Sequence, residues 1–121
     1  MHFDVDAWAD AYIRARMTSG DCDQSHPDYW AIEKFMYELD GELAEQCWQG
    51  IVAVVGRRPE VVLGMLAATL MEDLLDHDGQ TFIRRIETEA RRSPLFRRML
   101  RGGWESGPPD VWERLVAFRE N

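Results

Sequence analysis

The stretch from Val61 to Leu75 constrains the fold more than any other part of this chain, because it is apolar nearly all round. No charged residue occurs between Val61 and Met71. A helix without a polar face has to be covered on every side, which places it at the centre of a core. Pro59 suits its first turn, and Gly79 suits its end. We therefore expect a central helix with the rest of the chain packed around it.

Six further segments repeat apolar residues three and four positions apart, as a buried helical face requires. Their apolar stripes run over residues 8–15, 32–39, 43–54, 82–90, 95–100 and 111–118. No sustained alternation of β-branched residues occurs, and short connections favour antiparallel neighbours. The sequence predicts an all-α fold: a single compact helical domain over residues 1–121, with about six to seven short helices packed as antiparallel helical hairpins.

Residues with capping preferences mark the ends of these helices. Asp4 or Asp6 precedes the first helix, and Ser93 stands directly before a proline at the start of another. Both positions suit an N-cap, whose side chain accepts backbone N–H groups. Asp110, three residues before a glutamate, fits a variant capping box. Gly56 suits the left-handed position that closes a helix.

In a domain of this size the apolar stripes of neighbouring helices have to face one another. We expect a mutually packed core that includes Leu66, Leu70, Leu74, Phe82, Ile86, Phe96 and Trp112. Three of the five tryptophans, Trp8, Trp48 and Trp112, sit in apolar stripes. Trp30 and Trp104 are therefore the better candidates for exposure to solvent.

The charge of this chain is concentrated in its first half. The chain has 22 acidic and 14 basic side chains, which gives a formal net charge of −8. Residues 1–50 hold eleven of the acids and only three of the basic residues, whereas residues 51–121 are balanced. Such an asymmetry bears on partners and solubility and leaves the fold open.

Acidic residues crowd the segment from Asp21 to Glu45, in which Lys34 is the only basic residue. A field of one sign speeds association with an oppositely charged protein, and tryptophan is enriched in interface hot spots. The sequence therefore predicts a docking surface for a basic protein partner, such as a toxin, an effector or a defence complex. The candidate residues are Asp21, Asp23, Asp28, Trp30, Glu33, Glu38, Glu42 and Glu45. We expect these carboxylates to face solvent without arginine partners in the same chain; a solvated acidic face without a partner is the alternative.

On this interpretation the chain is a non-catalytic inhibitor, of the immunity-protein or anti-defence type, that neutralises a macromolecular partner. No serine lies in a nucleophile elbow, and no glycine-rich loop has phosphate-binding spacing. We therefore expect no catalytic residues, no metal and no cofactor. A metal-dependent hydrolase is the alternative, with Glu72, Asp73 and His77 as ligands and Asp76 nearby. The structural interpretation of this cluster is ion pairing with arginines across the Gly79 turn.

Seven arginines lie between Phe82 and Arg101, against two glutamates. Pairs of them seven residues apart share a helix face: Arg84 with Arg91, and Arg85 with Arg92. This basic strip is a second candidate surface, for nucleic acid or for a structural adaptor contact. The net charge of −8 disfavours binding of a polyanion. The strip has two further interpretations, as a face turned to the acidic half of the same chain and as solvated, partly self-paired arginines. A homo-oligomer is also possible.

The two cysteines predict reduced thiols rather than a disulfide. Cys22 and Cys47 lack metal-ligand spacing, and a chain of 121 residues does not need a disulfide to fold. Cys47 lies in an apolar stripe, where burial raises the pKa of a thiol and lowers its reactivity. The acidic start lacks the pattern of a signal peptide, and the uncharged run is too short to cross a bilayer. We expect a cytoplasmic protein without a membrane segment.

Three motifs carry a resemblance to a known family. They are L-A-A-x-x-x-E-D-L-L over 66–75, G-x-x-F-I-x-x-I-E-x-E-A-R-R over 79–92 and P-x-F-R over 94–97. Looser matches lie at 29–33, 47–51, 102–104 and 110–114. The chain resembles a bacterial domain-of-unknown-function family of small helical proteins, which implies a helical fold and no defined activity. Thr69-Leu70 replaces an expected Gly-Pro pair, which predicts a straighter central helix, and Asp78 stands where a His-Gly pair is expected.

Overall fold

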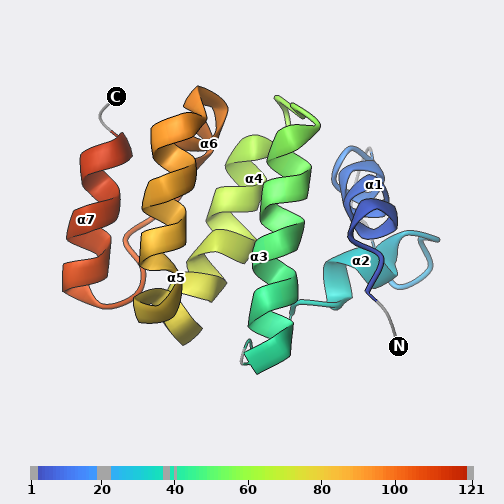
Figure 1. Cartoon of the computed structure of the whole chain (residues 1–121). Helices are drawn as coiled ribbons and strands as arrows, with labels where there is room; N and C mark the ends of the chain where they lie inside the picture. Colours follow the sequence, from blue (N-terminus) through green and yellow to red (C-terminus); the bar gives the residue numbers. More distant parts are fainter. Residues whose placement is uncertain (1–2, 19–22, 37–38, 40, 120–121) are drawn as a thin grey trace.

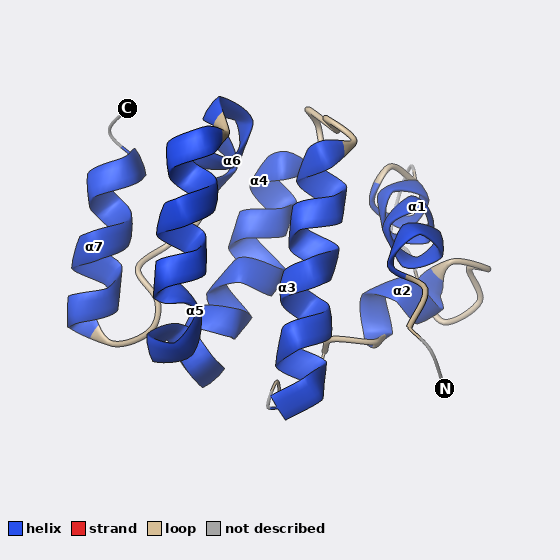
Figure 2. Cartoon of the chain, in the orientation of Figure 1, coloured by secondary structure: helices blue, strands red, loops and turns tan. Residues whose placement is uncertain are grey.

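The structure is a computed structural model, and it describes residues 3–18, 23–36, 39 and 41–119. The elements are α1 (Val5–Arg16), α2 (Tyr29–Glu33), α3 (Gly41–Gly56), α4 (Leu63–Leu66), the π-helical segment η1 (Ala67–Met71), α5 (Glu72–Arg92), α6 (Pro94–Leu100) and α7 (Pro109–Arg119). Figure 2 shows helices and loops throughout the described residues, and no strand occurs among them. The prediction of an all-α fold is confirmed.

In Figure 1, α3 stands at the middle of the molecule, with α1 and α2 on one side and α5, α6 and α7 on the other. α1 packs against α2 and α3, and α5 packs against α3, α6 and α7. Neighbours in the sequence thus lie side by side, as packed helical hairpins require. One cluster of buried hydrophobic residues runs from Trp8 on α1 to Leu115 on α7.

The contact between α1 and α3 rests on an indole ring packed against a glycine. Trp8 is fully buried and stacks on Tyr12, with ring centroids 4.9 Å apart. Its Nε1 donates a 2.9 Å hydrogen bond to the carbonyl oxygen of Ala31 on α2. A Cβ atom at Gly50 on α3 would lie 2.6 Å from the Trp8 ring, far inside van der Waals contact. Trp8 therefore joins α1, α2 and α3, and only glycine fits opposite it.

The expected central helix corresponds to α4, η1 and α5, which run from Leu63 to Arg92 and depart twice from regular α-helix. It begins at Leu63, so Pro59 precedes it instead of lying in its first turn. The expectation that it is covered on every side is wrong, because Val61 is 73% and Met65 41% exposed. At Asp78 the backbone is non-helical, with φ −154° and ψ 35°, so the predicted break near Gly79 exists as a kink within α5. Thr69 and Leu70, where a straighter helix is predicted, lie in η1, so the helix is not a regular α-helix at this point. The Thr69 hydroxyl donates to the carbonyl oxygen of Met65 at 2.6 Å, a bond that disturbs regular helix geometry.

The predicted core is confirmed at six of its seven positions. These are Leu66, Leu70, Leu74, Phe82, Ile86 and Phe96, all at least 95% buried. Trp112 is the correction: it is only partly buried and packs at the edge of the core. The guanidinium of Arg119 lies 5.1 Å from its ring centroid and covers the outer face. Trp8 and Trp48 are buried, and Trp30 and Trp104 are exposed, as expected.

α2 is shorter than the sequence predicts. The apolar stripe runs from Ile32 to Leu39, but the helix ends at Glu33, and Met36 is exposed. Phe35 and Leu39 are nevertheless fully buried. The stripe thus identified buried residues correctly, although Phe35 lies in a turn after the helix.

Two predicted N-caps are confirmed and one is wrong. Asp4 and Ser93 each accept a backbone N–H three residues later, at 3.0 and 3.1 Å. α7 begins at Pro109, so Asp110 lies inside its first turn instead of capping it. The Asp110 carboxylate accepts from the side-chain amide of Gln80 on α5, at 3.1 and 3.2 Å. It therefore links two helices, a role that the local sequence does not reveal.

The end of α3 also differs in detail from the prediction. α3 ends at Gly56, but the left-handed residue is Arg58, with φ 55°. Its backbone N–H donates to the carbonyl oxygen of Val55 at 3.0 Å, which closes the turn before Pro59. A non-glycine residue is thus held in a conformation that L-amino acids adopt at a cost.

Candidate functional site

Four of the predicted docking residues are exposed around α2 and the start of α3. Trp30 on α2 is 48% exposed, and Glu33 follows one turn later. Asp23 precedes α2, and Glu42 lies in the first turn of α3. Within the described part of the chain, these three carboxylates have no ion-pair partner. We call Asp23, Trp30, Glu33 and Glu42 the acidic surface. Two further candidates, Asp21 and Glu38, lie outside the described residues.

Two other candidates contradict the expectation that the acidic residues lack arginine partners. Asp28 accepts two hydrogen bonds from Arg14 on α1, at 3.0 and 3.1 Å. Glu45 on α3 binds Arg85 on α5 through both carboxylate oxygens, one of them at 2.8 Å. Hydrogen bonding to these guanidinium groups holds the pKa of Asp28 and of Glu45 below the usual range. Both carboxylates therefore stabilise helix contacts, and we exclude them from the acidic surface.

A hollow of about 560 Å³ lies next to the acidic surface, in the segment that precedes and begins α2. It is lined by Asp23, Gln24, Ser25 and Tyr29. The Asp23 carboxylate accepts both the backbone N–H and the hydroxyl of Ser25, and these bonds lower its pKa. The lowered pKa favours the charged form of this carboxylate, which lines the hollow.

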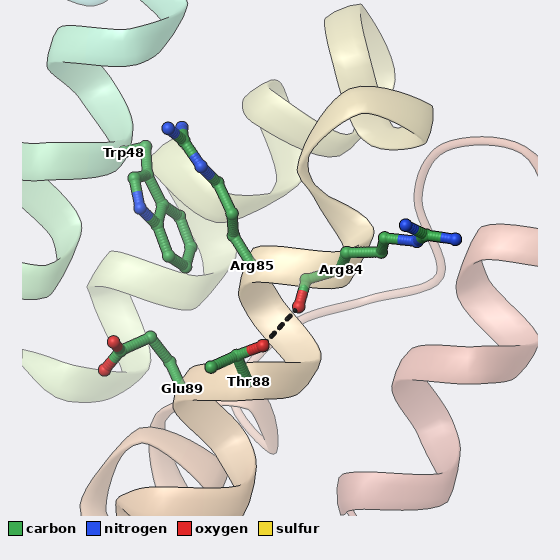
Figure 3. Close-up of a pocket in the computed structure, with 5 residues that line it drawn as sticks. All are labelled: Trp48, Arg84, Arg85, Thr88 and Glu89. Atoms are coloured by element: carbon green, nitrogen blue, oxygen red, sulfur yellow. Dashed lines mark hydrogen bonds between the residues drawn. The ribbon is translucent and has the colours of Figure 1, made fainter.

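A second hollow, of about 230 Å³, is lined by residues of α3 and α5 (Figure 3). Its lining consists of Trp48, Arg84, Arg85, Thr88 and Glu89. In Figure 3 the Arg85 side chain runs beside the Trp48 ring, and the Arg84 guanidinium points away from that ring. The Thr88 hydroxyl donates to the carbonyl oxygen of Arg84 at 2.9 Å. Of the donors that line this hollow, Arg85 is held by Glu45 of α3, and Thr88 is held by a backbone carbonyl of its own helix.

The predicted basic strip is largely engaged within the chain. Arg92 pairs with Glu89 at 3.6 Å, and Arg85 is held by Glu45. The Arg91 guanidinium lies 5.5 Å from the ring centroid of a phenylalanine on α7. Arg84 has no ion-pair partner among the described residues. The strip is thus divided among contacts to α3, α5 and α7 instead of forming a row of free charges.

Two of the four residues in the candidate metal cluster bind the loop between α6 and α7 instead of being grouped around a common point. Glu72 accepts from the Ser106 hydroxyl at 3.2 Å, and Asp76 accepts from the backbone N–H of Gly107 at 2.7 Å. These bonds hold the loop between α6 and α7, so the expected pairing with Arg84 or Arg85 is wrong. Asp73 lies partly buried, which raises its pKa. Among the described residues no three His, Cys, Asp or Glu side chains are grouped to hold a metal ion.

The remaining reactive side chains are the cysteines and His26. Cys47 is fully buried, and burial raises the pKa of its thiol well above the ordinary value, as expected. Cys22 lies outside the described residues. The sequence interpretation assigned no role to His26, whose ring nitrogens contact Thr18 and the backbone of Asp28. The signal for it was position: His26 stands two residues before Asp28, the residue that precedes α2, so its side chain is able to reach that backbone N–H.

Comparison with known proteins identifies a family and no further relative. A family of unknown function, DUF6869, matches residues 18–121, so the chain belongs to that family. This confirms the resemblance to a domain-of-unknown-function family. No curated protein and no solved structure matches the chain. In the described residues, every helix is too short or too polar to cross a membrane.

Proposed function

We propose that this chain is a small protein-binding domain whose acidic surface takes a basic protein partner and neutralises it. One observation carries the proposal: Trp30 is 48% exposed beside Glu33, a carboxylate that nothing in the described residues pairs. An exposed aromatic ring supplies buried area to an interface, and unpaired charge around it steers the approach of the partner.

Electrostatics favours this surface as the site of association. Carboxylates without counter-charges repel one another in the free protein, and a basic partner relieves that repulsion on binding. The attraction acts mainly on the association rate and extends over about 8 Å at physiological salt. Because Asp28 and Glu45 already bind arginines, only the remaining acidic residues supply this field. Binding is therefore expected to depend strongly on salt.

The alternatives have less support from the described contacts. Glu72 and Asp76 of the hydrolase interpretation bind the loop between α6 and α7. The arginines of the nucleic-acid interpretation are mostly held by acids or aromatic rings of the same chain. A stoichiometric inhibitor requires an exposed surface that a partner covers, and the exposed Trp30, among carboxylates that are unpaired in the described residues, supports this proposal.

The partner can be identified by cross-linking in the native cell. A photoreactive amino acid replaces Trp30 in one variant and Trp104, which is 77% exposed elsewhere on the molecule, in another. We expect a single basic protein to cross-link to the Trp30 position and not to the Trp104 position. A partner that cross-links only at the Trp104 position would contradict the proposal.

Charge reversal then tests whether the acidic surface drives binding to the purified partner. Glu33→Lys and Glu42→Lys should slow association about tenfold at low salt and much less at high salt, because steering is screened. Glu113→Lys is the matched control, since Glu113 is also exposed and unpaired among the described residues but lies on α7. Equal slowing by all three variants would show a general effect of net charge and refute a local docking surface.

A further inference from the structure

His26 connects the end of α1 with the start of α2 through a chain of hydrogen bonds. Its Nδ1 lies 3.0 Å from the backbone nitrogen of Asp28, and its Nε2 lies 2.8 Å from Thr18 Oγ1. Thr18 Oγ1 in turn lies 3.0 Å from the carbonyl oxygen of Arg14 on α1. One imidazole ring thus links the residues just after α1 with the residue that precedes α2.

The partners of the ring determine where its proton lies. The Arg14 carbonyl oxygen only accepts, so the Thr18 hydroxyl has to donate its single proton to that oxygen. Thr18 then accepts from His26, which requires a proton on Nε2. The Asp28 backbone N–H only donates, so Nδ1 has to be an unprotonated acceptor. The network is complete only when the His26 ring is neutral with its proton on Nε2.

Protonation of Nδ1 is incompatible with this arrangement. Two donors, Nδ1–H and the Asp28 N–H, would face each other at 3.0 Å, so the bond to the start of α2 is lost. Among the described residues, the carboxylates of Asp23 and Asp28 on the same segment interact electrostatically with the ring, and Arg14 on α1 binds Asp28. Both carboxylates attract an imidazolium, which competes with Arg14 for Asp28.

We propose that His26 is a proton-operated latch, which holds the start of α2 when the ring is neutral and releases it when the ring is protonated. α2 carries Trp30 and Glu33, so release changes the placement of the acidic surface. An imidazolium between Asp23 and Asp28 also reduces the negative field there. Both effects weaken the binding of a basic partner in acid. This consequence for binding rests on the proposed function, whereas the latch itself is a property of the free protein.

NMR on the free, full-length chain tests the latch directly. The ring nitrogens of His26 and the backbone amide of Asp28 are followed from about pH 8 to about pH 5, the range in which histidine titrates. We expect an unprotonated Nδ1 at the upper end, and an Asp28 amide shift with the same midpoint as the ring. A proton on Nδ1 at the upper end, or an Asp28 amide that does not follow the ring, would overturn the latch.

Two variants separate the titration from the hydrogen bond. In His26→Asn the side-chain oxygen is able to accept the same N–H, as in an Asx-turn, and it does not titrate. Its Asp28 amide should therefore stay hydrogen-bonded at every pH. His77→Asn is the control, because His77 is exposed on α5 away from this network, and it should leave the Asp28 response unchanged. An Asp28 amide that still titrates in His26→Asn would also overturn the latch.

The effect on binding is measured with a decalysine peptide as a basic probe. Wild-type affinity should fall severalfold between about pH 7.5 and about pH 5.5, while His26→Asn keeps most of its affinity. An equal loss in both proteins would refute the link between the latch and the acidic surface. Absence of peptide binding at both pH values would instead count against the proposed function, and the NMR titration would still decide the latch.

Discussion

At the scale of single residues, two helical glycines have opposite surroundings. Gly50 on α3 faces the Trp8 ring so closely that a Cβ would lie 2.6 Å from it. At Gly64 on α4 a Cβ would meet nothing within 4 Å. Glycine costs a helix interior roughly 1 kcal/mol relative to alanine. At Gly50 the close packing of Trp8 offsets this cost, whereas at Gly64 no contact of this kind offsets it.

We therefore expect opposite effects from the same substitution at these two positions. Gly50→Ala should lower the free energy of unfolding by about 1–3 kcal/mol, because the rigidly packed Trp8 ring has to move. Gly64→Ala should raise it by about 0.5–1 kcal/mol through helix propensity. Urea denaturation followed by circular dichroism measures both. A shift of both variants in the same direction would contradict the packing described between α1 and α3.

Arg58 supplies a second prediction at this scale. Its φ of 55° is costly for any residue with a Cβ, and glycine adopts it freely. Arg58→Gly should raise the free energy of unfolding by about 0.5–1 kcal/mol, and the β-branched Arg58→Val should lower it. Both values come from urea denaturation. A stabilised Arg58→Val would show that the turn after α3 does not require a left-handed residue.

At the scale of elements, α5 carries two neighbouring acids with opposite roles. Asp76 binds the backbone of Gly107 and so fixes the loop before α7. Asp73 is partly buried, and burial raises its pKa above the usual value for an aspartate. A raised pKa in the folded state means that ionisation costs more there than in the unfolded chain. The stability associated with protonated Asp73 is therefore lost as pH rises through the folded pKa.

Because the pKa of Asp73 is raised in the folded state, the effect of replacing Asp73 should depend on pH. Asp73→Asn should raise the melting temperature at neutral pH, because it removes a charge that the fold disfavours. The gain should vanish near pH 3, where wild-type Asp73 is itself protonated. Asp76→Ala should lower the melting temperature at neutral pH, since the Gly107 N–H loses its acceptor. Calorimetry at the two pH values provides the measurement, and a gain that persists in acid would rule out the burial of charge as its cause.

The ends and buried faces of the helices were predictable where neighbouring residues in the sequence determine them. They were less predictable where residues distant in the sequence determine them. The caps at Asp4 and Ser93 and the buried stripes follow from spacing and side-chain chemistry. The end of α2, the π-helical segment η1 and the side-chain bond of Asp110 to Gln80 depend on what lies opposite them in space. Periodicity alone does not carry that information.

At the scale of the whole molecule, some acids of the first half of the chain form ion pairs with arginines of the second half. The uneven charge along the sequence therefore partly holds the two halves of the fold together. Arg57, just after α3, binds Asp6 and Asp10 on α1 at 3.0 and 2.8 Å. Glu45 binds Arg85 across α3 and α5. The sequence predicted where acids are concentrated, and it had no means to tell paired from unpaired ones. That distinction needs the spatial arrangement of the helices, which reduces the candidate site to the acidic surface.

Paired and unpaired acids should respond differently to charge reversal. Glu45→Lys should lower the free energy of unfolding by on the order of 1 kcal/mol, because an exposed pair is lost and a lysine faces Arg85. Glu33→Lys should leave it equal or raise it, since it relieves repulsion among acids. Thermal unfolding at low salt compares the two variants. A loss of stability at Glu33 as large as that at Glu45 would mean that Glu33 has a structural role.

The π-helical segment η1 bears on how long a member of this family has to be. A π-turn holds one residue more than an α-turn, so it acts as a one-residue insertion inside an otherwise regular helix. Ala68 in this segment is exposed, and its removal would take nothing from the core. A chain shortened by that one residue would place Leu66 and Leu74 seven positions apart, on the same face of an ordinary helix. A chain with the π-helical segment and a chain one residue shorter with a regular α-helix at this point are thus both compatible with the same core.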